Sequence, residues 1–223
     1  MITFIKQNKI ALIISFFLPL VIMALNFSFL NITWGGTKTV LAGDAYHQYV
    51  NFHTLFSTIM HTGSGFLYTF TSGLGLNFLS FSSYYLGSFL MPLTYFFNAA
   101  TMPDGLYLLT LLKFGCIGLS AFISFKLMYH TLSKWLIVSL AISYTLMSFI
   151  VNQSEIIMWL DVFIWLPFII CGLHRMMDQR KCRLYFVSLT ILFTQNYYFG
   201  FMMALFLLGY FLVRLTYDGW SFK

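Results

Sequence analysis

The chain has 223 residues and a formal net charge of +6; 60% of its residues are hydrophobic, 21% are aromatic and only 8% are charged. This composition excludes an ordinary soluble domain and predicts an all-α polytopic membrane protein. The basic residues form short, scattered clusters, which excludes a nucleic-acid-binding patch. The three cysteines have no C-x-x-C spacing, so neither a disulfide framework nor a zinc site is indicated.

The first predicted element is a transmembrane helix over residues 10–30. At about 1.5 Å per residue, this apolar run just spans a hydrocarbon core of roughly 30 Å. Lys6 and Lys9 precede it, which places the N-terminus in the cytoplasm. A cleaved signal peptide is the alternative, but the run is longer than a usual signal sequence and has no small-x-small cleavage site before Asn31. We therefore expect a permanent first helix.

Residues 31–105 form a long, aromatic-rich segment between the first and second helices. Connections of this length are usually functional or disordered, and the aromatic content argues against disorder. We expect a folded outer loop in the headgroup region, with interfacial helices. A helix is predicted over residues 43–61, with Asp44 near its N-terminus, and glycines mark turns at residues 63–65 and 73–75.

Further apolar runs follow over residues 106–223 and complete a single transmembrane domain with six predicted crossings. Basic clusters separate several of these runs and serve as topology markers. The five predicted helices cover residues 106–128, 135–151, 156–173, 184–193 and 201–216.

Residues 81–97 are the ambiguous run, because about 17 largely apolar residues are the lower limit for a span and Pro92 lies inside it. If the run crossed the membrane, the basic cluster over residues 175–183 would lie outside, against the positive-inside rule. We therefore predict a re-entrant or interfacial helix here and cytoplasmic N- and C-termini. In this topology Lys38 lies outside the cell, and Lys113 lies within a transmembrane helix. The basic residues placed in the cytoplasm are Lys6, Lys9, Lys126, Lys134, Arg175, Arg180, Lys181, Arg183, Arg214 and Lys223.

The same topology sorts the acidic residues, since only Asp178 and Asp218 fall on the cytoplasmic side. Asp104 is predicted to cap the helix that starts near Gly105. Asp161 lies in an apolar helix and requires a partner or a water-filled cavity. Lys113, on the same side of the membrane, is the predicted cation for Asp161 or for an anionic ligand. The acids placed outside or in the outer leaflet are Asp44, Asp104, Glu155 and Asp161.

Asp44, His47 and Asn51 have spacings of three and four residues, so they share one face of a helix, with Gln48 beside them. Such a face can bind or activate a hydroxyl group, because a general base must lie within hydrogen-bond reach of the proton that it takes. The alternative is that Asp44 is a helix cap and His47 a surface histidine. The histidines are not spaced to present one metal-binding face, so a zinc site is not predicted.

Several stretches of the chain, in order, resemble the N-terminal part of the bacterial YfhO membrane proteins, and the resemblance covers nearly the whole chain. It implies a GT-C type glycosyltransferase, a polytopic enzyme that takes a sugar from a polyprenyl-phosphate carrier. The sugar would be added, outside the cytoplasm, to an envelope polymer such as lipoteichoic acid. The stretches are Gly43-Asp44 with Gln48-Tyr49, residues 72–77 (SGLGLN), residues 84–88 (YYLGS), residues 152–161 (NQSEIIMWLD) with residues 165–167 (WLP), and residues 196–200 (NYYFG).

The resemblance also implies roles for individual residues. In GT-C enzymes an acid of the first outer loop is associated with catalysis, and Asp44 matches that position. Lys113 is the candidate cation for the donor phosphate, whereas Glu155 and Asp161 are expected to line the cavity or to hold a divalent cation. The other expected substrate contacts are His47, Gln48, Tyr49, Asn196 and Tyr197.

The expected partners are the lipid bilayer, the polyprenyl-phosphate-linked donor and the polymer acceptor, and nucleic acid is not among them. The resemblance implies that members of the family are several times longer, so we expect a fragment, a truncated gene product or half of a split enzyme. A second chain that supplies the missing helices is then a further expected partner. The alternatives are a non-catalytic transport or assembly protein and an inactive fragment of the enzyme. The acids are concentrated toward the outer face, and the sequence has no inverted repeat. Both observations favour a reaction at the membrane surface over transport.

Overall fold

The computed structural model describes residues 2–71 and 73–217, which form an almost entirely helical protein. Ser72, Asp218 and Lys223, which figure in the predictions above, lie outside the described residues. The helices of the bundle are α1 (Ile2–Phe29), α4 (Met102–Met128), α5 (Lys134–Thr145), α6 (Ser148–Asn152), α7 (Leu160–Gln179), α8 (Arg183–Gln195) and α9 (Tyr197–Tyr217). The shorter elements are the π-helix η1 (Ala45–Tyr49), α2 (Val50–Thr62), β1 (Tyr68–Thr69), β2 (Leu76–Asn77), α3 (Phe78–Tyr85) and the 3-10 helices η2 (Met91–Phe96) and η3 (Ile157–Trp159).

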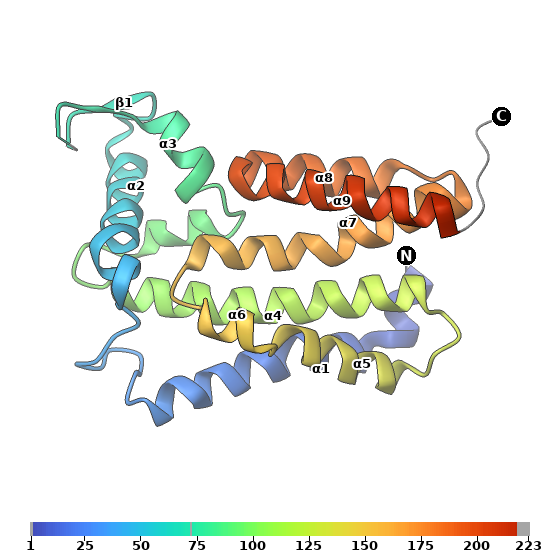
Figure 1. Cartoon of the computed structure of the whole chain (residues 1–223). Coiled ribbons are helices and arrows are strands. Elements are labelled where there is room, and N and C mark those ends of the chain that lie inside the picture. Colours follow the sequence, from blue (N-terminus) through green and yellow to red (C-terminus); the bar gives the residue numbers. More distant parts are fainter. Residues whose placement is uncertain (1, 72, 218–223) are drawn as a thin grey trace.

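The chain runs back and forth along the bundle, through α1, α4, α5 with α6, α7, α8 and α9 (Figure 1). α4 and α7 form its centre, because α4 packs on α1, α5 and α7, and α7 packs on α8. In the most apolar part of α4 and of α7, 67% of the residues are buried, against 28% in α1 and 17% in α9. α1 and α9 thus expose apolar side chains, as helices that face lipid do.

Among the described residues, four helices are long and apolar enough to cross a membrane: residues 3–29, 102–128, 157–179 and 197–217. The single helix predicted over residues 135–151 is wrong, because α5 and α6 are separated at Leu146 and Met147. α8 has 13 residues, which is about 20 Å of helix against a hydrocarbon core of about 30 Å. The all-α polytopic class is confirmed, whereas the count of six crossings stays a prediction.

Glycines allow α1 and α4 to approach each other closely. A Cβ atom at Gly118 would clash with the carbonyl oxygen of Ser15, and one at Gly115 would lie 2.9 Å from the ring of Phe16. Small residues at helix contacts are a usual means of close packing in membranes, where no hydrophobic effect drives two helices together. The α1–α4 contact therefore depends on backbone proximity as much as on side chains.

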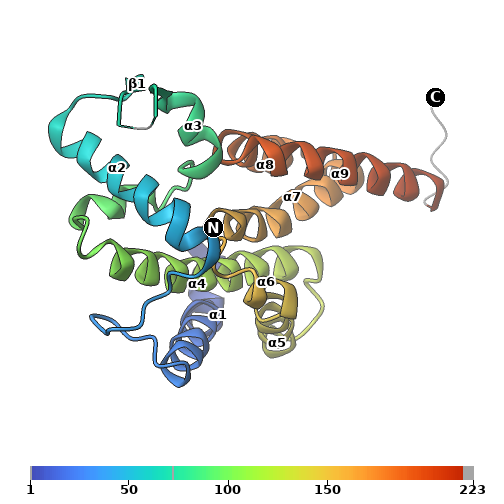
Figure 2. The same cartoon turned by 60° about the vertical axis from the view of Figure 1, so that its left-hand side comes forward.

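A cap formed by residues 30–71 and 73–101 covers one end of the bundle, at the left of Figures 1 and 2. α2 ends at Gly63, whose φ of 66° gives a left-handed C-cap. A short antiparallel ribbon then pairs Tyr68 with Asn77 and Thr69 with Leu76. The predicted helix over residues 43–61 and the predicted glycine turn at 63–65 correspond to η1 with α2 and to the turn after them.

The single re-entrant or interfacial helix predicted over residues 81–97 is wrong in its extent, because the segment contains the end of α3 and the separate helix η2. α3 begins earlier than predicted, since the side-chain oxygen of Asn77 caps it by accepting a 3.0 Å hydrogen bond from the backbone N–H of Ser80. Pro92 lies in the first turn of η2, where its missing N–H removes no helical hydrogen bond. With eight and six residues, neither helix is long enough to cross a membrane.

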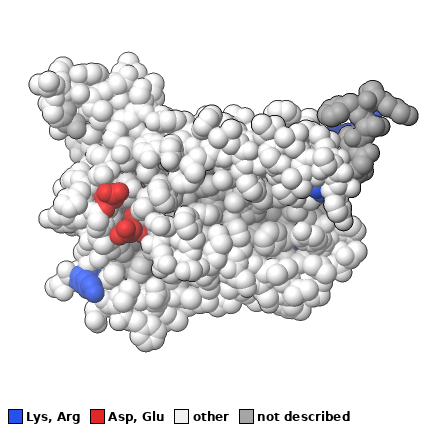
Figure 3. Space-filling view, in the orientation of Figure 1, with Lys and Arg blue, Asp and Glu red and all other residues white. Residues whose placement is uncertain are grey.

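Charged residues gather at the two ends of the bundle. Figure 3 shows acidic groups at the cap end and a broad surface almost free of charge between the ends. Five basic residues that were predicted to be cytoplasmic lie around the turns that end α4 and α7, at the end opposite the cap. They are Lys126, Lys134, Arg180, Lys181 and Arg183.

Candidate functional site

Asp44 lies on the cap, immediately before η1, with its side chain exposed. Its carboxylate accepts a 3.1 Å hydrogen bond from the side-chain amide of Gln48. Asp44 occupies the N-cap position of η1, but its side chain makes no capping hydrogen bond to the backbone. The carboxylate is therefore oriented by Gln48, and it does not cap the helix.

Glu155 approaches the Asp44 segment from the short connection between α6 and η3. A Cβ atom at Gly43 would lie 3.5 and 3.6 Å from the two carboxylate oxygens of Glu155, and Gly43 itself has a φ of +48°. Glycine permits both this left-handed backbone and the close approach. The exposed acids Asp44 and Glu155 thus lie on one surface, and Figure 3 shows two acidic groups side by side at the cap end.

Tyrosines surround the inner side of this acidic surface. Tyr49 is buried, and burial, followed by the Asp44 carboxylate, raises the pKa of its phenol. Burial is also the main cause that raises the pKa values of Tyr84 and Tyr85, whose rings lie 4.7 Å apart between centroids. These phenols are therefore protonated at neutral pH. The partly exposed Tyr84 and Tyr85 can donate a hydrogen bond to a ligand oxygen, whereas Tyr49, which is 1% exposed, is not open to a ligand in this structure.

The start of α9 adds two further predicted site residues. Asn196 is buried; its side-chain oxygen accepts from the backbone N–H of Phe199 at 3.0 Å, and its amide donates to the Tyr84 carbonyl oxygen at 3.4 Å. Asn196 therefore joins α9 to the cap and is not open to a ligand in this structure. Tyr197 is exposed, and its ring centroid lies 5.6 Å from that of Tyr84. Of these two residues, only Tyr197 presents a free surface.

Lys113 and Asp161 form a buried ion pair between α4 and α7, which is the first of the two partners predicted for Lys113. The Lys113 Nζ atom lies 2.7 Å from Asp161 Oδ2 and also donates to the carbonyl oxygen of Ile157 at 2.8 Å. The second oxygen of Asp161 accepts from the hydroxyl of Ser88 at 2.9 Å. The side chains of Lys113 and Asp161 are only 3% and 4% exposed, so neither is open to a ligand. Ser88 was missed, although it ends the YYLGS motif.

Histidines of the cap do not form a metal site. His47 is exposed beside Asp44, and its carbonyl oxygen accepts a 3.1 Å hydrogen bond from the Asn51 amide. His53 is buried, and burial lowers its pKa to about 4. Within residues 2–71 and 73–217, no group of three or more histidine, cysteine or acidic residues could hold a metal ion. Both oxygens of Asp161 are engaged by other side chains, so Glu155 and Asp161 do not share a cation in this arrangement.

The predicted capping role of Asp104 is wrong. α4 begins at Met102, with Thr101 at its N-cap position, and Asp104 lies in the first turn. Its carboxylate accepts a 2.8 Å hydrogen bond from the backbone N–H of Gly35. Asp104 therefore attaches the loop that follows α1 to the start of α4.

An apolar groove of about 390 Å³ lies between α4, α7 and α8. Phe89, the neighbour of Ser88, is one of its lining residues, and the indole N–H of Trp165 donates to the Gln195 side-chain oxygen at 2.7 Å within its wall. The groove therefore lies in the apolar part of the bundle, with one lining residue from the cap. Its apolar lining includes Phe89, Cys116, Ile164, Trp165, Phe168 and Ile191.

The family model described as "Bacterial membrane protein YfhO" matches residues 15–223. Neither the curated proteins nor the solved structures gave a match. The family match covers more than nine-tenths of the chain, including Asp44, Glu155 and both members of the ion pair. The chain belongs to the YfhO family of bacterial membrane proteins.

Proposed function

We propose that this chain is the N-terminal part of a GT-C type glycosyltransferase that acts at the outer face of the cytoplasmic membrane. The observation that carries the proposal is the exposed Asp44 carboxylate, held by Gln48 and flanked by Glu155 and the tyrosines at the cap end of the bundle. A polyprenyl-phosphate-linked sugar presents its reacting carbon where apolar and polar phases meet. The cap end of an apolar helical bundle is the corresponding place on this protein.

In the proposed reaction, an acceptor hydroxyl attacks the anomeric carbon of the donor sugar. The bond from that carbon to the phosphate oxygen breaks, and polyprenyl phosphate leaves with the bonding electron pair. Asp44 takes the hydroxyl proton as general base. The exposed ring of Tyr197 offers a face on which a sugar can stack, and His47 offers a polar contact beside Asp44.

The groove between α4, α7 and α8 supports a role in holding the apolar carrier. Its walls are almost wholly apolar, its volume of about 390 Å³ lies in the range of ligand pockets, and Phe89 of the cap is one of its lining residues. A prenyl chain in this groove would bring its phosphate toward the cap end. The acceptor would be an envelope polymer such as lipoteichoic acid.

Lys113 and Asp161 receive a positioning role in this proposal. Their charges compensate each other, and their remaining hydrogen bonds go to Ile157 and Ser88. This arrangement fixes α4 against α7 and attaches the cap to α7 through Ser88. A contact between Lys113 and the donor phosphate would require the pair to open.

The test is sugar transfer from a polyprenyl-phosphate donor in membranes that contain the full chain, with Asp44→Asn compared with the unmodified protein. Loss of a general base predicts a decrease of about 100-fold to 10,000-fold in rate. Asp178→Asn is the matched control, because this acid lies near the end of α7, away from the cap. Equal rates for Asp44→Asn and the unmodified protein would remove Asp44 from the base role.

A second candidate function, transport or assembly without catalysis, has its own supporting observations. Broken helices and charges within the bundle are typical of transporters, and the chain has both the break between α5 and α6 and the Lys113–Asp161 pair. Absence of transfer by the unmodified protein, together with binding of the donor lipid, would favour this function.

A further inference from the structure

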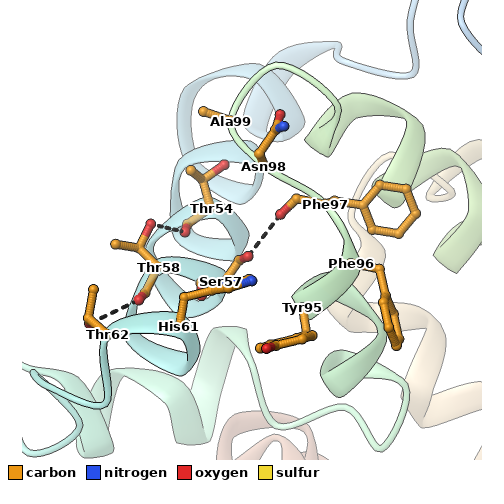
Figure 4. Close-up of a pocket in the computed structure, with 10 residues that line it drawn as sticks. All are labelled: Thr54, Ser57, Thr58, His61, Thr62, Tyr95, Phe96, Phe97, Asn98 and Ala99. Carbon is orange, nitrogen blue, oxygen red and sulfur yellow. Dashed lines mark hydrogen bonds between the residues drawn. The ribbon is translucent and has the colours of Figure 1, made fainter.

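A second cavity lies on the cap, between α2 and η2, separate from the Asp44 surface (Figure 4). Its volume of about 430 Å³ is within the range of small-molecule sites. Figure 4 shows the side chains of one face of α2 on one side and Tyr95 with the chain that follows it on the other. Residues of these two walls include Thr54, Ser57, Thr58, His61, Tyr95 and Asn98.

The α2 wall presents hydrogen-bond acceptors. The hydroxyl of Thr58 donates to the Thr54 carbonyl oxygen at 2.9 Å, and that of Thr62 donates to the Thr58 carbonyl oxygen at 3.0 Å. Their hydroxyl hydrogens are thus engaged, and their lone pairs remain available to a ligand. His61 Nδ1 lies 2.7 Å from the Ser57 carbonyl oxygen, so Nδ1 carries the hydrogen and Nε2 of the neutral ring is an acceptor.

The opposite wall presents aromatic surface. Tyr95 stacks on the His61 ring, with centroids 4.1 Å apart and planes 3° from parallel, and it retains 41% of its accessible surface. Phe96, which follows it, is 78% exposed. Exposed aromatic rings beside oxygen and nitrogen acceptors suit a molecule with apolar C–H faces and hydroxyl donors, which is the surface of a sugar or polyol.

The residues that line the cavity include no acid, lysine or arginine. An anionic ligand would meet acceptor lone pairs without a compensating cation, and this costs binding energy. A neutral ligand rich in hydroxyl groups has no such cost. The walls therefore favour binding of a neutral sugar or polyol over binding of a ligand that carries phosphate groups.

A polar stripe on α2 connects this cavity with the surroundings of Asp44. Asn51, Thr54, Thr58 and His61 are spaced by three or four residues and so share one face of the helix. His47 continues the stripe toward Asp44, since its carbonyl oxygen accepts from the Asn51 amide at 3.1 Å. At about 1.5 Å per residue, the stripe is roughly 20 Å long, which suits an extended chain of several units.

We propose that the cavity between α2 and η2 binds a neutral part of the acceptor polymer, a sugar substituent or the polyol between two phosphates, and that the stripe on α2 leads the polymer to Asp44. The inference rests on the proposed transferase function for the identity of the acceptor. The binding itself is a separate property, because it requires neither donor lipid nor a reactive Asp44.

The test measures binding without donor, by saturation-transfer NMR on the full chain in lipid nanodiscs, with maltose and cellobiose as neutral probes and glycerol 3-phosphate as the anionic probe. We expect one of the neutral disaccharides to bind and Tyr95→Ala to weaken its binding roughly threefold to tenfold, the usual range for an aromatic contact. Thr58→Val should also weaken it. Tyr129→Ala is the control, because Tyr129 is 49% exposed and lies beyond the end of α4, away from the cap.

Asp44→Asn should bind the disaccharide as the unmodified protein does, so failure of catalysis and failure of this site can be told apart. Absence of disaccharide binding, unchanged binding by Tyr95→Ala and Thr58→Val, or tighter binding of glycerol 3-phosphate would each overturn the proposal. Nanodiscs that contain a diglucosyl lipid test whether the cavity binds the sugar headgroup of a membrane lipid instead of a sugar of the polymer. Displacement of the soluble disaccharide by this lipid would overturn the assignment to a polymer.

Discussion

The Lys113–Asp161 pair predicts a specific pattern of stability when its members are replaced singly and together. Asp161→Asn removes the negative charge and leaves Lys113 charged at a site where its side chain is 3% exposed. An uncompensated buried charge of this kind costs about 3–5 kcal/mol of unfolding free energy. The double variant Lys113→Met/Asp161→Asn removes both charges, and the amide oxygen can still accept from Ser88.

In the double variant, the principal loss is the hydrogen bond that the Ile157 carbonyl oxygen accepts from Lys113. An unsatisfied buried acceptor costs about 1–3 kcal/mol. We therefore expect the double variant to be more stable than Asp161→Asn by roughly 2 kcal/mol, the difference between the two costs. Unfolding in mixed micelles with increasing SDS, followed by tryptophan fluorescence, measures both values. A cost below about 1 kcal/mol for Asp161→Asn, or a double variant no more stable than Asp161→Asn, would refute the reasoning.

Three further predictions concern the cap, the helix packing and the topology. The pKa of His53 is about 4 in the folded protein, against about 6.5 in the unfolded chain. Between these pH values the unfolded chain binds more protons, so the free energy of unfolding should fall by roughly 3 kcal/mol as the pH falls from about 6.5 to about 4. His53→Gln should remove most of this pH dependence. Gly118→Val should separate α1 from α4, because its Cβ would meet the Ser15 carbonyl oxygen, and should lower the unfolding free energy by about 1–3 kcal/mol. In a cysteine-free background, Val40→Cys should react with an impermeant thiol reagent in intact cells and Asp178→Cys should not; labelling of Asp178→Cys would overturn the predicted topology.

The ion pair is the part of the candidate site that follows most directly from the sequence. Lys113 and Asp161 each lie in an apolar run, and a buried charge requires a partner. The positive-inside rule places both in the same half of the membrane, which leaves few alternatives for pairing. Ser88 could not be assigned in the same way, because a serine in a loop has many local hydrogen-bond partners.

Helix breaks and contacts within the cap could not be predicted. The separation of α5 from α6 falls at Leu146 and Met147, where neither proline nor glycine marks it and the apolar character of the sequence continues. The stacking of His61 on Tyr95 joins residues 34 positions apart in sequence, and it depends on the turn at Gly63 and on the start of η2. Such contacts are set by tertiary packing, which no local pattern of residue types specifies.

The cap is attached to the bundle by an apolar cluster that includes Tyr49, Leu106 and Met158 and by side-chain hydrogen bonds. Among the described residues, these bonds include Gly35 with Asp104 on α4, Ser88 with Asp161 on α7, and the Tyr84 carbonyl oxygen with Asn196 before α9. Asp161 serves both a cap contact and the ion pair, whereas Ser88 serves the cap contact alone. Ser88→Ala should therefore disturb the position of the cap and leave the ion pair in place. Asp104→Ala affects only the loop after α1. A transferase that loses activity with Ser88→Ala but keeps it with Asp104→Ala would show that the reaction depends on how the cap is held over α7.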